Sequence, residues 1–337
     1  MQNNTKVTVL GAGSWGTTLA LMMAKCGYRV SLWEFRPDAV RVMEHERENK
    51  EFLPGHPFPH NLEITDDITE AAADAQFILI AVPSHGFRGT AARLADGPAK
   101  DVTIISAAKG IEQGSLMRMS EVLGDVWGDK FDQRKFAVLS GPSHAEEVVI
   151  GLPSSAVAAS VEIETAHRVQ CLLSGERFRV YSSDDVVGVE LGGSLKNVVA
   201  IAAGLADGLG FGDNTKGVLL TRGLAEISRL GVKLGGKPST FAGLSGMGDM
   251  ITTCCSRHSR NRYVGEQIGQ GRKLKDVLAG MVMVAEGVRT TGSAFALGQR
   301  EEVEMPITEQ VHRILFEDVD PLKATMELMG RRLKVED

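Results

Sequence analysis

Short apolar runs alternate with mixed, helix-like segments through the first half of the chain. Each run is bounded by glycine, proline or polar residues, and the five clearest are 7–10, 28–33, 77–82, 102–106 and 136–139. A continuous apolar run of this length is typical of a parallel strand covered on both faces. The alternation with helical segments, including a charged amphipathic one at 38–50, predicts a doubly wound α/β sheet, which 155–160 and 178–181 complete.

The pattern changes near residue 186, after which the chain is helical with glycine breaks and few strand-like runs. A chain of 337 residues is too long for one compact core, so two domains are expected. We place the boundary near 190, with a Rossmann-like dinucleotide-binding domain at 1–190 and an all-α domain at 191–337. Gly192 and Gly193 are predicted to open a long apolar helix through 194–205.

The first apolar run leads directly into a glycine-spaced turn, Gly11-Ala12-Gly13-Ser14-Trp15-Gly16. In a dinucleotide fold Gly11 permits the tight turn, Gly13 lets the backbone approach a pyrophosphate, and Gly16 lets the next helix pack on the sheet. An apolar helix over 17–25 and a second strand follow, which is the context the motif requires. The turn and the helix N-terminus therefore predict a bound dinucleotide.

The second strand ends at Glu34-Phe35-Arg36. At this position an acid binds the 2′-hydroxyl of NAD, whereas a cation accommodates the 2′-phosphate of NADP. The sequence supplies both, and Arg36 either faces a 2′-phosphate or is a solvated turn residue. The choice between the two coenzymes stays open.

Other polar side chains follow the ends of strands, where ligands of such sheets bind. They are Ser84, Lys109, Gly141 and Ser143. In the helical half, Lys196 lies within an apolar helix, and Asp249 is predicted to lie in a glycine-rich turn. The cluster Ser259-Arg260-Asn261 suits a phosphate because it combines a helix start with a bidentate cation.

Each of these residues also has a simpler interpretation. On helical periodicity alone, Lys196 is better interpreted as a lysine whose head group reaches solvent. Arg260 can be interpreted as a surface ion-pair residue, and Lys109 as a solvated loop residue. His85 and His144 lie near strand ends, but no carboxylate is spaced to orient either. We therefore expect a positioning or packing role for both histidines.

Composition narrows the possible functions. A net charge of −6 provides no basic field for nucleic acid. The four cysteines lack paired spacing, which favours free thiols in a reducing cytoplasm. We expect no signal peptide, no membrane span of the roughly 18 apolar residues required, no metal site and no nucleophilic serine elbow.

Taken together, six motifs resemble the bacterial type of NAD(P)-dependent glycerol-3-phosphate dehydrogenase. In chain order they are GAGSWG at 11–16, VPSH at 82–85, KG at 109–110, GPSHAEE at 141–147, LKNVVAIAAG at 195–204 and GMGDMITTCCSRHSRN at 246–261. The resemblance implies a Rossmann domain with an all-α substrate-binding and dimerisation domain, usually in a cytoplasmic homodimer. It implies hydride transfer between NAD(P)H and dihydroxyacetone phosphate, which gives sn-glycerol 3-phosphate for glycerophospholipid synthesis.

The resemblance also implies roles for individual residues. Lys196 is the implied catalytic proton donor and acceptor. The substrate side is Lys109, Gly141, Ser143, Lys196, Asp249, Ser259, Arg260 and Asn261. The cofactor side is Gly11, Gly13, Ser14, Trp15, Gly16, Phe35, Arg36, Lys109, Ala145, Arg260, Val284 and Glu286. Glu34 and Phe35 depart from the family pattern, which puts its usual NADPH preference in doubt.

Burial of Lys196 and the like charge of Lys109 are expected to lower the pKa of the Lys196 ammonium, with Asp249 opposing them. Two rival functions are a related reductase of ketopantoate or of a sugar-acid phosphate, and a redox-sensing dinucleotide-binding module. The phosphate-suited cluster at 259–261 disfavours an unphosphorylated substrate, and the acidic net charge disfavours a nucleic-acid-linked sensor.

Overall fold

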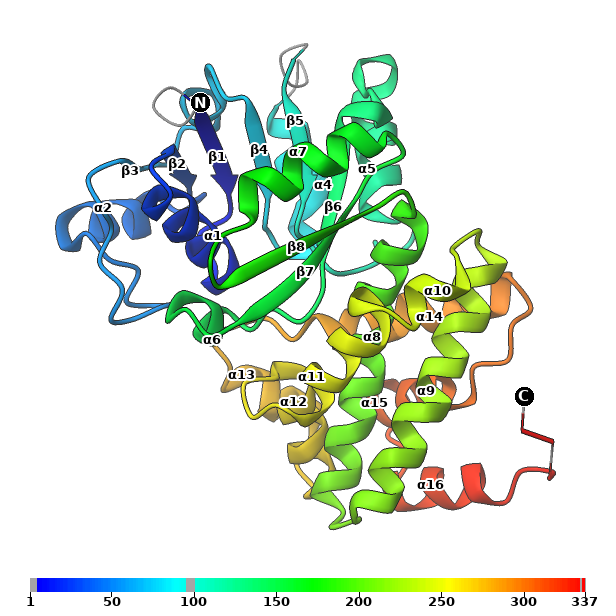
Figure 1. Cartoon of the computed structure of the whole chain (residues 1–337). Helices are drawn as coiled ribbons and strands as arrows, with labels where there is room; N and C mark the ends of the chain where they lie inside the picture. The colour runs from blue at the N-terminus through cyan, green and yellow to red at the C-terminus, as the bar shows by residue number, and fades with distance from the viewer. Residues whose placement is uncertain (1–4, 95–100, 334, 337) are drawn as a thin grey trace.

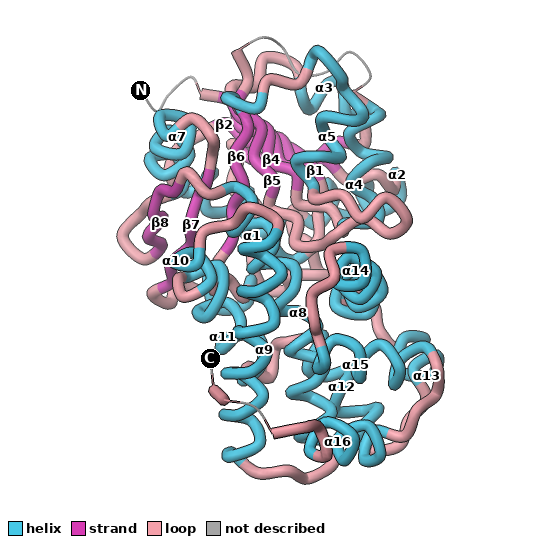
Figure 2. Tube along the Cα trace, turned by 90° about the vertical axis from the view of Figure 1, so that its right-hand side faces the viewer, coloured by secondary structure: helices cyan, strands magenta, loops and turns pink. Residues whose placement is uncertain are grey.

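The structure is a computed structural model that describes residues 5–94, 101–333 and 335–336. A layered α/β domain is followed by a helical domain, seen as the upper and lower halves of Figures 1 and 2. In the described residues one sheet has eight strands in the order β3-β2-β1-β4-β5-β6-β7-β8. All neighbouring pairs are parallel except β6 with β7, which are antiparallel.

The strands confirm the predicted apolar runs to within a few residues. Their bounds are β1 Lys6–Leu10, β2 Arg29–Trp33, β3 Leu62–Thr65, β4 Phe77–Ile80, β5 Thr103–Ser106, β6 Phe136–Ser140, β7 Ser154–Ala159 and β8 Phe178–Ser183. The sequence pattern missed β3 because this edge strand has an exposed Glu63 between two buried residues rather than an apolar run. The order reverses between β1 and β4, and ligands of open α/β sheets bind at such a point.

Helices cover both faces of the sheet. One face packs against α1, α6 and α7, and the other against α3, α4 and α5. Their bounds are α1 Ser14–Lys25, α2 Pro37–Glu46, α3 Ile68–Ala72, α4 Ser84–Arg93, α5 Met119–Trp127, α6 Ala145–Val149 and α7 Ile163–Leu173, with 3₁₀ turns η2 Gly128–Lys130 and η3 Gln133–Lys135. The predicted helix at 38–50 is shorter, because Arg47 adopts a left-handed conformation after α2.

The helical domain is built around α8 (Val186–Gly208). Around it lie α9 Asp213–Lys233, α10 Pro238–Phe241, the π-helical turn η4 Leu244–Gly248, α11 Asp249–Cys255, α12 Arg260–Gly269, α13 Leu274–Ala279, α14 Glu286–Arg300, α15 Pro306–Phe316 and α16 Pro321–Met329. The helix α8 passes through the predicted boundary near residue 190 without a break. The division of the chain at that residue stays a prediction.

The predicted start of this helix at Gly192 is wrong. The helix begins six residues earlier because the side chain of Asp185 caps it, accepting a hydrogen bond from the Gly188 amide at 2.8 Å. Gly192 and Gly193 lie inside the helix, at positions where residues of other elements approach the helix backbone too closely for a side chain to fit. A Cβ on Gly192 would lie 2.8 Å from the Ser245 carbonyl oxygen, and one on Gly193 2.3 Å from Ser140 Oγ.

The same helix corrects the expectation that no apolar stretch approaches membrane-spanning length. By length and composition α8 could cross a membrane, but 94% of its most apolar window is buried inside the protein. Its burial by α9, α11, α12 and α14 identifies it as the core helix of the second domain (Figure 1).

Glycines let α12 approach the backbone of α8. A Cβ on Gly265 would lie 2.0 Å from the Ile201 carbonyl oxygen, and one on Gly204 1.9 Å from that of Arg262. These two contacts leave no room for a side chain between the helices. They fix α12, whose first residue is Arg260, against the helix that carries Lys196.

We predict that Gly265→Ala lowers the free energy of unfolding by about 1–3 kcal/mol, the usual cost of overpacking. A lower urea midpoint would report it. Gly89→Ala is the matched control, because Gly89 lies in α4 and its Cβ would meet no atom within 4 Å. The control is expected to be stabilising by about 0.5–1 kcal/mol. Equal midpoints for both variants would contradict the close packing of α8 and α12.

Candidate active site

A cavity of about 190 Å³ lies between the carboxyl edge of the sheet and the helical domain. From the first domain it is lined by the glycine turn and strand ends, at Gly13, Ser14, Trp15, Ala81, Val82, Pro83, Ala107, Ala108, Lys109, Ser143 and His144. From the second domain it is lined by Lys196, Asn197, Asp249, Thr253, His258, Ser259, Arg260, Asn261, Val284 and Glu286. Most of the predicted site residues therefore meet in one place.

The glycine turn forms one wall of this cavity. Gly11 has a φ of +109°, and a Cβ there would lie 2.9 Å from Val82 Cγ1. A Cβ on Gly16 would lie 1.9 Å from the Gly11 carbonyl oxygen. Among the described residues, and apart from Gly13 and its chain neighbours, no atom lies within 4 Å of a Cβ built on Gly13, which precedes the first residue of α1. The turn thus has open space at Gly13 next to the free N–H groups of a helix, which suits a pyrophosphate.

A network of three charged side chains lies opposite the turn. The Lys196 Nζ donates hydrogen bonds to Asp249 Oδ1, at 2.6 Å, and to the Thr253 hydroxyl. The Lys109 Nζ donates to Asp249 Oδ2 at 2.8 Å, to the Gly141 carbonyl at 3.0 Å and to Ser143 Oγ at 3.2 Å. Asp249 therefore joins a lysine of the first domain to a lysine of the second.

Burial sets the charge state of this network. It lowers the pKa of the Lys196 ammonium to about 8; Asp249 opposes the shift and Lys109 adds to it. Burial alone would raise the pKa of the Asp249 carboxyl, but Lys109 and Lys196 together hold it below its usual range. At neutral pH the site therefore holds a carboxylate and an amine that gives up its proton readily.

Thr253 was not identified from the sequence. Asp249 is the first residue of α11, not part of a turn, because η4 runs into that helix without a loop. Thr253 lies four residues later, on the same face of α11. Helical spacing from Asp249 would have revealed it, but the glycines at 246 and 248 favoured a turn.

The three residues of the predicted phosphate site, 259–261, differ in their contacts with the other described residues: the side chains of Ser259 and Asn261 bond within the protein, and that of Arg260 does not. The Ser259 hydroxyl caps α12 by accepting from the Arg262 amide at 3.2 Å. The Asn261 side chain donates to Asn197 Oδ1 at 2.9 Å and accepts from the Gly287 amide at 2.8 Å. Arg260 is exposed, and no hydrogen bond or ion pair to it is found in the described part of the chain. Of the three side chains in this cluster, the Arg260 guanidinium is therefore the one whose hydrogen-bond donors are available to a ligand.

Glu286 connects the two domains at the rim of the cavity. It is the first residue of α14, and its carboxylate accepts from the Ser84 amide at 3.0 Å and from Ser84 Oγ at 2.6 Å. Val284 lies beside it in the cavity wall. Of the remaining predicted residues, Ala145 begins α6 and is buried, and Gly141, with a φ of +130°, follows β6.

The two histidines, His85 and His144, differ in their burial and in their position relative to the cavity. His85 is exposed on α4, away from the cavity lining. His144 lines the cavity, and burial together with Lys196 lowers the pKa of its imidazole. Its buried Nε2 has no hydrogen-bond partner among the described residues. A neutral ring in the cavity wall agrees with positioning or packing rather than with a charged acid.

Phe35 and Arg36 lie outside this cavity. They follow β2, on the other side of the glycine turn, where Phe35 is 60% exposed. Arg36 is paired with Glu34 and Glu51, with N···O distances of 2.8 and 2.9 Å. Arg36 is therefore neither unpaired nor fully solvated in this structure, and its role toward the coenzyme stays a prediction.

The fold and the site define an NAD(P)-dependent dehydrogenase with a Rossmann domain followed by a helical domain. The strand order 3-2-1-4-5-6 and the glycine turn are those of a dinucleotide-binding sheet. The amine of Lys196 is buried in the same cavity as that turn, where it can serve as an acid or a base.

Comparison with known proteins identifies the family. Residues 6–166 match the N-terminal part of NAD-dependent glycerol-3-phosphate dehydrogenase, and residues 185–326 match its C-terminal part. The chain belongs to this family. It is 53% identical over 330 residues to glycerol-3-phosphate dehydrogenase [NAD(P)+] of Prosthecochloris aestuarii, covering 98% of this chain and 99% of the relative. The enzyme of Chlorobium luteolum is 50% identical with the same coverage.

Solved structures of related proteins support the same family assignment. Glycerol-3-phosphate dehydrogenase from Coxiella burnetii superimposes with a TM-score of 0.92 and 41% identity, covering 97% of this chain and 99% of the other. A ketopantoate reductase from Ralstonia eutropha, at 16% identity and a TM-score of 0.59 over 95% of this chain and 100% of the other, shares the fold alone. The cofactor of the chain is NAD(P)H, as its family and its glycine turn indicate.

We predict that the Lys196 amine titrates near pH 8 rather than near its ordinary pKa of 10.5. Nuclear magnetic resonance of protein with ¹³C at the lysine Cε measures this directly, and Lys196→Met identifies the signal by its loss. Asp249→Asn is expected to lower the midpoint further, because the carboxylate stabilises the ammonium. A midpoint near 10.5 in the unaltered protein would contradict the described burial.

Proposed function

We propose that Lys196 donates the proton when this chain reduces dihydroxyacetone phosphate to sn-glycerol 3-phosphate, and accepts it in the reverse reaction. The observation that carries the proposal is the buried amine of Lys196, which shares one cavity with the glycine turn and with the unpaired Arg260. An amine, a dinucleotide turn and an unpaired guanidinium are what a small phosphorylated ketone requires for reduction.

Reduction adds a hydride to the ketone carbon and a proton to its oxygen. NAD(P)H, when bound, supplies the hydride. As the carbonyl oxygen gains negative charge, the Lys196 ammonium stabilises it and transfers a proton to it, leaving a neutral amine. The lowered pKa assists this transfer, because an ammonium with a pKa of about 8 is a stronger acid than an ordinary lysine.

Asp249 and Thr253 fix the position of the amine. Their oxygens hold Nζ of Lys196, while the second carboxylate oxygen of Asp249 holds Lys109. Lys109 also bonds to Gly141 and Ser143, so these substrate-side residues form one rigid wall. A rigid wall keeps the reacting groups in place without an entropic cost at each turnover.

Arg260 is proposed as the main phosphate ligand. Ser259 and Asn261 act mainly by holding the first turn of α12, since their side chains are engaged within the protein. The phosphate is remote from the reacting carbon, so its binding energy orients the ketone toward Lys196.

We predict that Arg260→Met raises the KM for dihydroxyacetone phosphate at least about tenfold, the effect of losing one charge-assisted hydrogen bond. NAD(P)H oxidation at 340 nm provides the assay, with unphosphorylated dihydroxyacetone and ketopantoate as alternative substrates. Activity on dihydroxyacetone is expected to change little, because it lacks the group that Arg260 binds.

The matched control is Arg257→Met, since Arg257 is exposed and does not line the cavity. An unchanged KM in the Arg260 variant would remove Arg260 from the phosphate site. Ketopantoate reduced as efficiently as dihydroxyacetone phosphate would contradict the proposed substrate.

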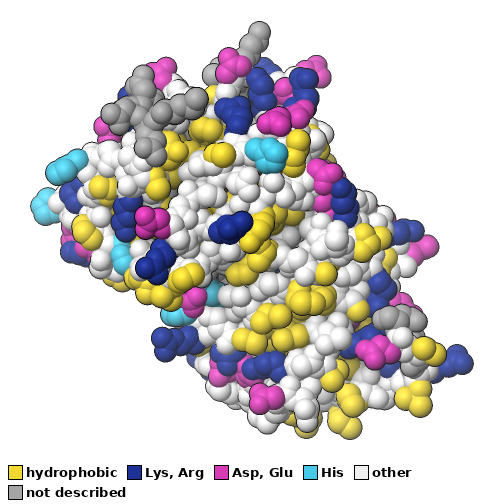
Figure 3. Space-filling view, viewed as in Figure 1, with side chains coloured by type: hydrophobic (Ala, Val, Ile, Leu, Met, Phe, Trp, Pro, Cys, Tyr) yellow, Lys and Arg dark blue, Asp and Glu magenta, His cyan; other side chains and the backbone are white. Residues whose placement is uncertain are grey.

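We further propose that the chain acts in the cytoplasm as a homodimer and supplies glycerol 3-phosphate for glycerophospholipids. Acidic and basic side chains are interspersed on the face in Figure 3, which fits a small-molecule enzyme rather than a nucleic-acid-binding protein. Hydrophobic side chains gather on the helical half of the same face. This distribution favours the helical domain as the dimer interface.

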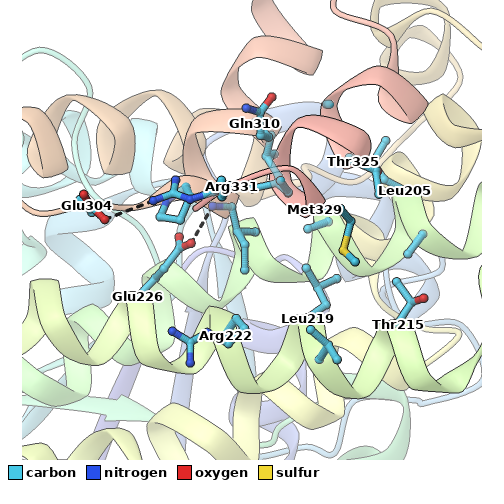
Figure 4. A pocket seen from close by; sticks show the side chains of 18 of the residues that line it. Leu205, Thr215, Leu219, Arg222, Glu226, Glu304, Gln310, Thr325, Met329 and Arg331 are labelled. Atoms are coloured by element: carbon cyan, nitrogen blue, oxygen red, sulfur yellow. Dashed lines mark hydrogen bonds and ion pairs between the residues drawn. The ribbon is translucent and has the colours of Figure 1, made fainter. Parts of the chain in front are cut away.

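A second cavity, in the helical domain, supports this choice of interface. It has a volume of about 880 Å³ and is lined by α8, α9, α15 and α16, with Leu219, Met329 and Arg331 among the side chains shown in Figure 4. Two of its charged groups are paired within the chain, since Glu226 caps α15 through the Ile307 amide and Arg331 bonds to Glu304. Two of its lining residues, Val218 and Met329, are exposed apolar side chains.

We predict that light scattering coupled to size exclusion gives a mass twice the 36.2 kDa of one chain at micromolar concentration. Val218→Glu is expected to shift the protein toward the monomer, because it places a charge on the exposed face of α9. The control is Val161→Glu, because Val161 is also an exposed valine but lies in the first domain. A monomeric unaltered protein would contradict the dimer, and an unaffected Val218 variant would contradict this interface.

A further inference from the structure

The carboxyl end of β2 carries a buried acid beside the glycine turn. Glu34 directly follows β2 and is 4% exposed. The Gly11 amide donates to the Trp33 carbonyl at 3.0 Å, so the turn and the start of Glu34 are joined. In a Rossmann sheet an acid about 20 residues after the glycine motif, at this strand end, binds the 2′-hydroxyl of the adenosine ribose.

The cation at this position already has two acidic partners. Arg36 Nε donates to Glu34 Oε1 at 2.8 Å, and its two terminal nitrogens donate to the two oxygens of Glu51 at 3.0 and 2.9 Å. The bidentate bond to Glu51, with Glu34 adding to it, raises the pKa of the Arg36 guanidinium. Arg36 also lies over the Phe52 ring, 5.5 Å from its centroid.

Glu51 is held in place by the glycine turn itself. The neighbouring Asn49 is 2% exposed, and its side-chain amide donates to the Ala12 carbonyl at 2.7 Å and to Thr17 Oγ1 at 2.8 Å. The same side chain accepts from the Phe52 amide at 3.2 Å. The loop that carries Glu51 is therefore fixed to the coenzyme site.

The charges at this end of the site disfavour a phosphate. Two carboxylates face one guanidinium, which leaves a net negative charge where NADPH would place its 2′-phosphate. The burial of Glu34 leaves that repulsion poorly screened. Within the described chain no hydrogen bond occupies Oε2 of Glu34, so this oxygen can accept one from a ribose hydroxyl.

We propose that this chain selects NADH over NADPH through Glu34 and Glu51, with Arg36 acting as their counter-ion rather than as a phosphate ligand. The proposal rests on the proposed function and names the coenzyme of the same site. The clearest support is the ion pair between the buried Glu34 and the partly exposed Arg36, because it places the acceptor of a 2′-hydroxyl where NADPH carries a phosphate.

Direct binding of NADH and NADPH, followed by nucleotide fluorescence without a ketone, tests this proposal. The unaltered protein is expected to bind NADH at least about tenfold more tightly, about 1.4 kcal/mol. In the double variant Glu34→Gln/Glu51→Gln, Arg36 loses both carboxylates and becomes available to a phosphate. Its affinity for NADPH is expected to rise at least about tenfold, while its affinity for NADH falls.

Two further variants separate this role from general effects. Adding Arg36→Met to the double variant is expected to abolish the increase in affinity for NADPH, because the 2′-phosphate then loses the arginine that would bind it. Glu44→Gln, on the exposed face of α2, is the matched control and is expected to change neither affinity. Melting temperatures confirm that each variant is folded.

Equal or tighter binding of NADPH by the unaltered protein would overturn the proposal while leaving the proposed function intact. A double variant that keeps the original preference would overturn the roles of Glu34 and Glu51. A clear NADH preference in a protein that reduces no dihydroxyacetone phosphate would support the proposal and refute the proposed function.

Discussion

The structure depends on one buried carboxylate that holds two ammonium groups. Asp249 joins Lys109, which follows β5 of the first domain, to Lys196 on α8 of the second. Burying these charges is costly, and the carboxylate offsets that cost only while both partners are in place. The network therefore links the two domains at the cavity wall and leaves Lys196 with an amine that exchanges its proton near neutral pH.

Backbone packing positions this network. Glycines at 192, 193, 204 and 265 let η4, β6 and α12 approach α8 more closely than any side chain would allow. As a result Asp249, at the start of α11, reaches Lys196, and Arg260, at the start of α12, lies in the wall of the same cavity. The bond from Glu286 to Ser84 adds a second connection between the domains at the cavity rim.

The sequence predicts the elements that have a strong local pattern. Apolar runs predicted seven of the strands, and the glycine spacing with its flanking strand and helix predicted the turn at Gly11 to Gly16. Elements set by tertiary contacts were missed or misplaced. The start of α8 depends on the cap at Asp185, and the helical position of Asp249 depends on η4 running into α11. Thr253 was missed because the glycines beside Asp249 favoured a turn, so that the helical spacing of the two residues was not applied. The Glu51–Arg36 pair has no local pattern, because it rests on a contact between two separate segments.

The most direct measurement is a crystal structure with NAD⁺ and dihydroxyacetone phosphate bound. We expect the Nζ atom of Lys196 within hydrogen-bond distance of the ketone oxygen, about 2.6–3.2 Å, with Asp249 still bound to the amine. A ketone held on the far side of Asp249, or an amine separated from the substrate by protein, would contradict the central claim.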